Sequence, residues 1–344
     1  MEVRVRPLDL TLTTSLRNAQ GEQSVSANVV VEIEHEGITG LGEAAPNWYY
    51  GERREIVLAA LPALGERLGD DPLLIEDIIG ELDGPRFQGH TDAKAALDMA
   101  LYDLMGKRLG VPVYRLLGLN PARAPQTSYT IAIDSPDEMA RRARAATEAG
   151  YSILKIKVGT RQDIEIVKAI RSATDATLRV DANGAWTTKE AIQTIDALAP
   201  YAIEFVEQPV AARDLDGLRL VRERVPLPII ADESCLTLED IPLIATCVDG
   251  INIKLMKCGG IHTALNMIHT ARAHHLTVML GCNIESSLAI TAAALLSPLV
   301  DYADLDSPLL IQHDPFVGVT FAGSQLVLPA GPGLGVSPRT EQDH

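Results

Sequence analysis

Leu154-Lys155-Ile156-Lys157-Val158 is the stretch that decides the fold. Successive side chains of a β-strand point to opposite faces, so Lys155 and Lys157 project from the same face of an otherwise apolar run. Lysine is seldom buried, and a lone Lys-x-Lys of this kind is typical of an edge strand with a solvated face. The residues downstream favour another interpretation, in which both lysines point into a functional site.

Short apolar runs alternate with amphipathic segments from Gln126 to about Ser307. One of the expected helices, Ser135–Ala149, starts with an N-cap serine followed by proline. The alternation predicts an α/β fold, a (β/α)7-8 TIM-like barrel, although a doubly wound open sheet has the same pattern. The eight expected strands lie near residues 126–132, 151–157, 177–181, 203–207, 228–232, 250–254, 277–281 and 301–305.

The rest of the chain predicts a second, smaller domain. Strands are expected at residues 2–10, 27–35 and 38–43, followed by a helix from Thr91 to Gly110, so that residues 1–120 form an α+β domain. Pro121–Pro125 is the expected boundary, residues 121–308 form the barrel, and residues 309–344 are expected to return to the first domain. Two loops, residues 14–25 and 46–51, are either ordinary surface or lids.

The bulk composition excludes several classes of protein. With 47% hydrophobic and 22% charged residues the chain is typical of a globular protein, and its net charge of −16 disfavours nucleic acid or an anionic membrane as a partner. No apolar run reaches membrane-spanning length. The four cysteines show no C-x-x-C spacing and the N-terminus lacks a secretory pattern, so we expect a cytoplasmic protein without a zinc site or disulfides.

Charged residues end five successive strands of the expected barrel, 22 to 26 residues apart: Lys157, Asp181, Glu207, Asp232 and Lys254. Active sites of such barrels lie on this carboxyl-terminal rim. Each carboxylate alone is equally consistent with a helix cap. Three that converge need a cation, and oxygen ligands favour Mg²⁺, with Mn²⁺ as a possible substitute. Asn183 and Glu233 are expected to support these ligands.

The two outer lysines predict a reaction. Lys157 and Lys254 come from strands four positions apart in an eight-stranded barrel, so they should face each other across its mouth. Lys155 and a divalent ion would both lower the pKa of Lys157, which would make it a base near neutral pH. A metal bound to a substrate carboxylate stabilises the enediolate that forms when the α-proton leaves. The pattern therefore predicts a two-base 1,1-proton transfer, a racemisation or epimerisation beside a carboxylate.

Over nearly its whole length the chain resembles the enolase superfamily, and within it the muconate lactonising subgroup. The segment Gly281–Glu285 has no histidine, which speaks against the mandelate racemase subgroup. The resemblance rests on five short motifs that are specific only together: Lys155-Ile156-Lys157, Asp181-Ala182-Asn183, Val206-Glu207-Gln208-Pro209, Ala231-Asp232-Glu233-Ser234 and Asn252-Ile253-Lys254.

Asp304-Leu305-Asp306 is similar to the D-x-D motif of dipeptide epimerases of the L-Ala-D/L-Glu epimerase type. This similarity implies that Asp304 and Asp306, on one face of a strand, hold the free α-ammonium group of a dipeptide. A solvated or helix-capping acidic pair is the alternative. A lyase of the same subgroup, either a cycloisomerase or an o-succinylbenzoate synthase, would keep the metal and the lysines without this pair, and a non-catalytic barrel is a third possibility.

The resemblance also implies that the N-terminal domain is a capping domain whose two loops shape specificity. Arg17, in the first loop, is either a surface residue or a ligand for the carboxylate of a C-terminal glutamate. The aromatic cluster Trp48-Tyr49-Tyr50 in the second loop instead favours an apolar side chain. Thr130 and Cys282-Asn283-Ile284 are expected to line the substrate pocket. The sequence leaves the dipeptide, and whether the chain forms a homo-oligomer, open.

Overall fold

A computed structural model describes residues 1–340, so residues 341–344 of the expected C-terminal segment lie outside the described residues. Its largest sheet has eight parallel strands in chain order, from β4 to β11. The strands are β4 (Tyr129–Ile131), β5 (Ile153–Lys157), β6 (Thr177–Asp181), β7 (Ile203–Glu207), β8 (Ile229–Ala231), β9 (Gly250–Ile253), β10 (Thr277–Leu280) and β11 (Tyr302–Ala303).

The first and last of these strands meet, which closes the sheet into a barrel. Thr127, just before β4, pairs in parallel with Ala303 of β11. The N–H of Ser128 donates to the carbonyl oxygen of Ala303 over 3.1 Å. The predicted TIM-like barrel is therefore confirmed, and the alternative of an open doubly wound sheet is wrong.

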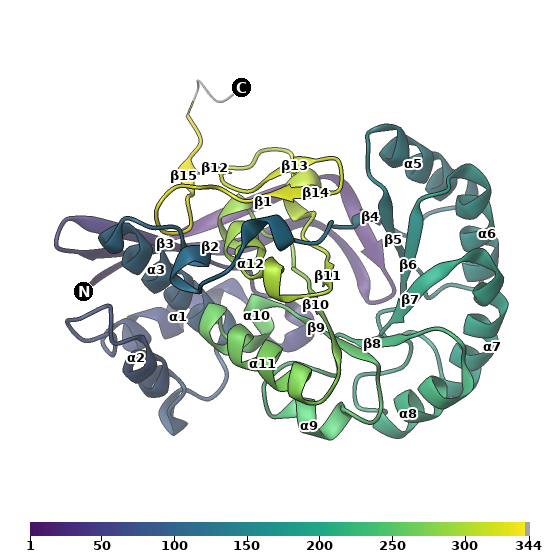
Figure 1. The fold of residues 1–344 in the computed structure, drawn as a ribbon, viewed down its shortest axis with the longest axis horizontal. Coiled ribbons are helices and arrows are strands. Elements are labelled where there is room, and N and C mark those ends of the chain that lie inside the picture. The colour runs from purple at the N-terminus through teal and green to yellow at the C-terminus, as the bar shows by residue number, and fades with distance from the viewer. Residues whose placement is uncertain (341–344) are drawn as a thin grey trace.

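Helices surround the strands on the outside (Figure 1). Thr187 and Glu190 form a capping box at the start of α7, and Ser135 caps α5 as its sequence predicts. Within the described residues no α-helix follows the eighth strand, which makes the barrel (β/α)7β. The helices are α5 (Pro136–Glu148), α6 (Asp163–Ala173), α7 (Thr188–Leu198), α8 (Leu215–Arg224), α9 (Asp240–Ile244), α10 (Leu255–Cys258), α11 (Ile261–Ala273) and α12 (Ser287–Ala294), with the 3₁₀ turns η4 (Ala199–Tyr201), η5 (Ser297–Leu299) and η6 (Ser307–Leu309).

The N-terminal domain pairs an antiparallel sheet with helices on one side. Gly40 and Gly42 of β3 allow α3 to pack directly on the sheet, because a Cβ at either position would lie 2.0 or 1.9 Å from a carbonyl oxygen of that helix. Its elements are β1 (Glu2–Asn18), β2 (Gly21–His35), β3 (Ile38–Ala44), α1 (Arg54–Gly65), α2 (Ile75–Leu82), α3 (Thr91–Leu109) and α4 (Val113–Leu116), with the 3₁₀ turns η1 (Trp48–Tyr50), η2 (Pro85–Phe87) and η3 (Pro121–Arg123).

The expected loop at residues 14–25 is instead a β-hairpin, a correction to the sequence analysis. β1 and β2 continue to pair up to Asn18 and Gly21, after a register shift between Thr11 and Leu16. The hairpin reaches the barrel, where the N–H of Ile133 donates to the carbonyl oxygen of Arg17 over 2.8 Å. Backbone hydrogen bonds hold these two strands together, so they need no alternation of apolar and polar side chains. Their polar sequence therefore does not predict strands.

The C-terminal segment contains short strands that contact both domains: β12 (Phe316–Val317), β13 (Thr320–Ala322), β14 (Gln325–Val327) and β15 (Ser337–Pro338). Ser324, between β13 and β14, accepts the N–H of Thr127 at the base of the barrel over 2.8 Å. Farther along, the N–H of Leu334 donates to Asp103 of α3 over 2.8 Å. We keep the division at about residue 120 as a proposal, with this segment completing the capping domain.

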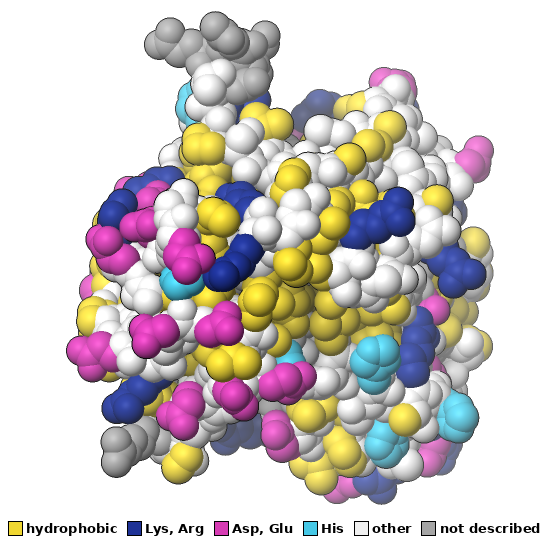
Figure 2. All heavy atoms as spheres, turned by 60° about the vertical axis from the view of Figure 1, so that its left-hand side comes forward, with side chains coloured by type: hydrophobic (Ala, Val, Ile, Leu, Met, Phe, Trp, Pro, Cys, Tyr) yellow, Lys and Arg dark blue, Asp and Glu magenta, His cyan; other side chains and the backbone are white. Residues whose placement is uncertain are grey.

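The surface gives two further observations. Acidic and basic side chains are interspersed on the face seen in Figure 2, and hydrophobic side chains line a hollow near its centre. In the part of the chain that the structure describes, no helix is long and apolar enough to cross a bilayer.

Candidate active site

The strand with which the sequence analysis began lies inside the barrel wall. β5 pairs with β4 on one side and β6 on the other, so it is not an edge strand. Lys155 is 3% exposed and Lys157 8% exposed. The pairing of Lys157 with Asp181, and of Asp181 with Glu207, places consecutive strand ends side by side on one rim. The interpretation of the two lysines as a solvated edge is therefore wrong.

Lys155 joins three carboxylates. Its Nζ lies 3.1 Å from Asp181 Oδ2, 2.8 Å from Glu207 Oε2 and 2.7 Å from Asp304 Oδ2. Burial alone would lower the pKa of Lys155, but the negative charges of Asp304, Glu207 and Asp181 raise it well above its usual value. In this structure Lys155 is thus the cation at the centre of the acidic cluster.

Lys157 shares one of these partners. Its Nζ lies 2.6 Å from the same Asp181 Oδ2 that Lys155 contacts, so the two ammonium groups are close neighbours, as the alternation of the strand predicts. Burial raises the pKa of Asp181, but Lys157 and Lys155 outweigh it and lower the value to about 2. The expected influence of Lys155 on proton transfer by Lys157 stays a proposal.

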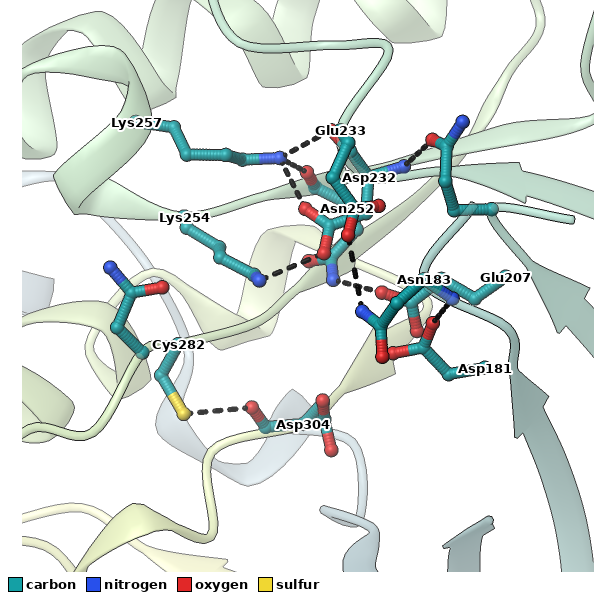
Figure 3. Close-up of polar contacts among 12 residues, drawn as sticks. Asp181, Asn183, Glu207, Asp232, Glu233, Asn252, Lys254, Lys257, Cys282 and Asp304 are labelled. Atoms are coloured by element: carbon teal, nitrogen blue, oxygen red, sulfur yellow. Dashed lines mark hydrogen bonds and ion pairs between the residues drawn. The ribbon is translucent and has the colours of Figure 1, made fainter. Parts of the chain in front are cut away.

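On the opposite side of the mouth, Asp232 is held by two lysines (Figure 3). Lys254 Nζ lies 2.8 Å from Oδ2 and Lys257 Nζ lies 2.6 Å from Oδ1. Burial raises the pKa of Asp232, but Lys254 and Lys257 together bring it well below its usual range. Lys257 also donates to the carbonyl oxygens of Asp232, Cys235 and Asn252, so its position is fully determined.

Asp181, Glu207 and Asp232 are all at most 1% exposed, and their surroundings suit a hard cation. Burial, followed by repulsion from Asp181, raises the pKa of Glu207 to about 8. Burial and Asp232 raise the pKa of Glu233 to about 7. Within residues 1–340, several buried oxygens here have no hydrogen-bond partner: Asn183 Oδ1, Glu207 Oε2, Glu233 Oε2 and Asn252 Oδ1. Lys155 lies near Glu207 Oε2 but in poor hydrogen-bond geometry.

No group of three His, Cys, Asp or Glu side chains in the described residues is arranged to hold a metal as it stands. Lysines bridge the carboxylates instead. The donor set nevertheless fits Mg²⁺, because it contains only oxygens and because buried oxygens such as Glu207 Oε2 and Asn183 Oδ1 have no hydrogen-bond partner in the described part of the chain. Asn183 connects two of the acidic side chains, since its N–H donates to Asp181 and its side-chain amide to Glu233.

Asp304 and Asp306 lie on the same cavity. Ser128 Oγ donates to Asp304 Oδ1 over 2.6 Å, and the N–H of Thr130 donates to Asp306 Oδ2 over 2.6 Å. Burial and the charge of Asp304 raise the pKa of Asp306 to about 7. Within the described chain the side chain of Asp306 does not cap η6, and both residues are at most 5% exposed. The alternative of a solvated or capping pair is therefore not supported.

One cavity brings most of the predicted site residues together. Asp181, Glu207 and Asp232 are buried beside it. Its barrel side is lined by Thr130, Lys155, Lys157, Asn183, Glu233, Lys254, Cys282, Asn283, Ile284, Asp304, Asp306, Ser307 and Leu310, and its capping side by Leu16, Asn18, Gln20, Gln23, Asn47 and Tyr50.

The hairpin tip contacts the barrel rim. Gln20 Nε2 donates to Glu233 Oε1 over 2.6 Å. Gly159 has φ of +107°, and a Cβ there would lie 2.7 Å from the Cβ of Ala19, so glycine permits the close approach of the tip. Arg17 is exposed and does not line the cavity, which leaves its predicted role in substrate binding without support in the geometry.

Several polar residues of the site were not predicted from the sequence. Asn252, whose amide donates to Glu207 over 2.8 Å, precedes Lys254 by two residues, so the alternation that linked Lys155 and Lys157 would also have indicated it. Lys257 follows Lys254 by one helical turn. Gln208 has φ of +36°, and its Oε1 accepts the N–H groups of Asp232 and Ser234. The residues that neighbour Gln208 in the sequence do not indicate that its side chain accepts the N–H groups of Asp232 and Ser234.

Two family descriptions match the sequence. "Mandelate racemase / muconate lactonizing enzyme, N-terminal domain" matches residues 1–118, and "Enolase C-terminal domain-like" matches residues 138–342. The chain belongs to this family. The N-terminal match corresponds to the α+β domain described above, and the C-terminal match covers the closed barrel from β5 to β11.

Similar family members cover almost the whole chain. An L-Ala-D/L-Glu epimerase of Bacteroides thetaiotaomicron is 42% identical over 98% of this chain and 88% of its own length. A hydrophobic dipeptide epimerase of Enterococcus faecalis is 40% identical over 98% and 99%. The crystal structure of a dipeptide epimerase from Enterococcus faecalis V583, complexed with Mg and the dipeptide L-Leu-L-Tyr, superimposes with a TM-score of 0.93 at 40% identity, over 98% of this chain and 99% of that one.

Proposed function

We propose that this protein is a Mg²⁺-dependent dipeptide epimerase that inverts the α-carbon of the C-terminal residue. One observation carries the proposal: Lys157 and Lys254 follow strands four positions apart, yet line the same cavity as Asp304 and Asp306. Two basic groups on opposite sides suit proton transfer at both faces of a carbon, and the carboxylates beside them suit a substrate ammonium group. The dipeptide epimerases among its relatives support the same activity.

Asp181, Glu207 and Asp232 would hold the Mg²⁺ ion, with Asn183 and Glu233 orienting them. When bound, the ion supplies positive charge where negative charge develops on the substrate carboxylate. Mn²⁺ accepts the same oxygen ligands and is proposed as a substitute.

The proton transfer is divided between the two lysines. One lysine, in its neutral form, removes the α-proton, and the C–H electron pair moves into the adjacent carboxylate to give an enediolate. The opposite lysine, as an ammonium, donates a proton to the other face, so a C–H bond breaks and another forms without net change. Lys155 places a second positive charge beside Lys157, since both contact Asp181 Oδ2, and we propose that it assists proton transfer by that lysine. Thr130, Cys282, Asn283 and Ile284 line the cavity and would contact the rest of the dipeptide.

Deuterium exchange tests this function. The enzyme, with Mg²⁺ in D₂O, is incubated with dipeptides that end in acidic, aromatic or aliphatic residues. We expect one deuteron to appear by mass spectrometry at the α-carbon of the C-terminal residue, with loss of the signal in EDTA and recovery on addition of Mg²⁺. Turnover of a dehydration substrate of the o-succinylbenzoate synthase type, with no exchange in any dipeptide, would overturn the proposal in favour of a lyase.

We also infer a reducing compartment, the cytoplasm, because all four cysteines are free. Alkylation checks this inference. The protein is extracted and alkylated under denaturing, non-reducing conditions, and mass spectrometry should then find four modified thiols.

A further inference from the structure

Glu43, near the end of β3 in the capping domain, is fully buried where that domain meets the barrel. Its Oε1 accepts the N–H of Ser286 over 3.0 Å and the side-chain amide of Asn28 over 2.7 Å. Its other oxygen, Oε2, contacts the hydroxyl of Ser286. Both carboxyl oxygens are therefore used, and two of the three contacts join it to a single barrel residue.

Ser286 belongs to a segment that shapes the cavity. Residues 281–286 lead from β10 into α12, and Cys282, Asn283 and Ile284 of this segment line the cavity. Ser286 is the N-cap of α12, because its hydroxyl accepts the N–H of Leu288 over 3.2 Å. Glu43 thus holds the residue at which the cavity wall becomes a helix.

A second route connects the same two regions. The amide of Asn28 that donates to Glu43 also donates to the carbonyl oxygen of Ile284 over 2.9 Å, and Ser26 Oγ holds the amide oxygen of Asn28 over 2.7 Å. One residue beyond β3, the carbonyl oxygen of Ala45 accepts the side-chain amide of Asn283 over 3.1 Å. The capping domain therefore holds the wall at three residues, 283, 284 and 286.

Burial makes this network sensitive to change. Glu43, Asn28 and Ser286 are each 0% exposed, so a donor that lost its acceptor would find no water to replace it. Burial also raises the pKa of Glu43, although the hydrogen bonds from Ser286 and Asn28 lower it. A glutamine has the same shape: its Oε1 can accept from the N–H of Ser286 and from Asn28, and its Nε2 can donate to the Ser286 hydroxyl, which is free to rotate.

We infer that Glu43 is a positioning residue, which fixes the 282–284 wall of the substrate cavity from the capping domain. The inference rests on the proposed function for the identity of the substrate, but not for the contacts. It means that the rigid sheet of the capping domain, and not only its hairpin and η1, determines the shape of the cavity.

The kinetic test compares Glu43→Ala with Glu43→Gln. Because the wall contacts the substrate and not the proton-transfer atoms, Glu43→Ala should raise KM for the best dipeptide by about 10-fold to 100-fold and change kcat less. Glu43→Gln should stay within about threefold of the wild type, since it keeps the hydrogen bonds. Asp103→Ala is the matched control: Asp103 is another buried carboxyl of this domain, bound to Leu41, Lys107 and Leu334 and away from the wall, and its removal should leave KM unchanged.

Hydrogen–deuterium exchange by mass spectrometry provides a second readout that needs no substrate. The N–H groups of residues 282–290 should exchange faster in Glu43→Ala than in the wild type, and at wild-type rates in Glu43→Gln and Asp103→Ala. Equal KM and exchange in Glu43→Ala and the wild type would overturn the inference, as would an equal increase in Asp103→Ala. A wild type that exchanges no dipeptide α-proton would overturn the proposed function, and the exchange rates of residues 282–290 would still decide the role of Glu43.

Discussion

The two sides of the cavity differ in chemistry. From the barrel come charged groups that are already engaged, such as Lys155 among three carboxylates and Lys254 with Asp232. From the capping domain come neutral groups: amides of the hairpin and of Asn47, together with Leu16 and Tyr50. The barrel side is therefore equipped for metal binding and proton transfer, and the capping side for selection among side chains. Changes on the barrel side should lower the rate, whereas changes on the capping side should mainly alter KM.

Loss of either lysine that we propose as a proton-transfer group should give the largest effect. Lys157→Met and Lys254→Met should each lower kcat for net epimerisation by about 10²-fold to 10⁴-fold, since a positioned acid or base contributes that much. The remaining lysine can still exchange the α-proton of one stereoisomer with solvent. Polarimetry measures inversion, and deuterium uptake from each stereoisomer measures exchange.

Lys168, an exposed lysine of α6, provides the control for these two variants. Lys168→Met should retain wild-type rates. If Lys157→Met or Lys254→Met also did so, the barrel side would not be the catalytic side and the assignment of two bases would be wrong.

Lys257→Met tests whether the barrel side depends on a lysine that lies beneath the cavity. It removes a buried cation with four oxygen partners. The Asp232 carboxylate then keeps its ion pair with Lys254 but loses the one with Lys257. Breaking a buried ion pair costs about 3 to 5 kcal/mol, so the urea midpoint of unfolding should fall. Loss of an orienting partner should also weaken Mg²⁺ binding by about 10-fold to 100-fold, measured by calorimetry. Unchanged Mg²⁺ affinity would make Lys257 a purely structural residue.

The barrel side was also the more predictable side. Lys157, Asp181 and Glu207 could be placed because strands have a period of two and βα units have similar lengths, so regular spacing brings strand ends to one rim. Lys257 was missed because three of its four contacts are to backbone oxygens, those of Asp232, Cys235 and Asn252, which no side-chain pattern encodes.

The capping side could not be predicted to the same degree. Its hairpin was expected to be a loop, because strands that are supported by backbone pairing and by the barrel rim need no apolar alternation. Arg17 was the candidate on this hairpin, yet Gln20, three residues later, reaches Glu233. Which hairpin side chain faces the cavity depends on the register shift between Thr11 and Leu16, and the sequence does not reveal that shift.

Asp98 lies at the junction between the capping domain and the barrel, and its ionisation should make the stability of the protein depend on pH. Its carboxyl, in α3, accepts the N–H groups of Ile261 and His262 at the start of α11, and burial raises its pKa to about 8 from an ordinary 3.8. Because the folded value is the higher one, the stabilisation by protonated Asp98 is complete below about pH 4 and is lost as the pH rises through about 8.

Urea unfolding between pH 4 and 9 measures this effect. The unfolding free energy of the wild type should decrease relative to Asp98→Asn by at most about 1.4 kcal/mol per pH unit, the limit for one proton. Parallel curves for the two proteins would show that Asp98 ionises without cost, and that the helix N-terminus and its two N–H donors outweigh burial.

The smallest effect is expected on the capping side, from Gln20→Ala. This change removes one hydrogen bond to Glu233, worth about 1 kcal/mol, so KM should rise about fivefold while kcat stays near the wild-type value. Arg17→Ala, on the same hairpin but exposed, should change neither constant for any dipeptide. A loss of activity in Arg17→Ala confined to dipeptides ending in glutamate would restore the interpretation from the sequence and show that the hairpin moves when substrate binds. A fall in kcat in Gln20→Ala accompanied by weaker Mg²⁺ binding, as expected for Lys257→Met, would instead mean that the hairpin contact through Glu233 supports the proposed metal ligands, and the division between a catalytic and a selective side would no longer hold.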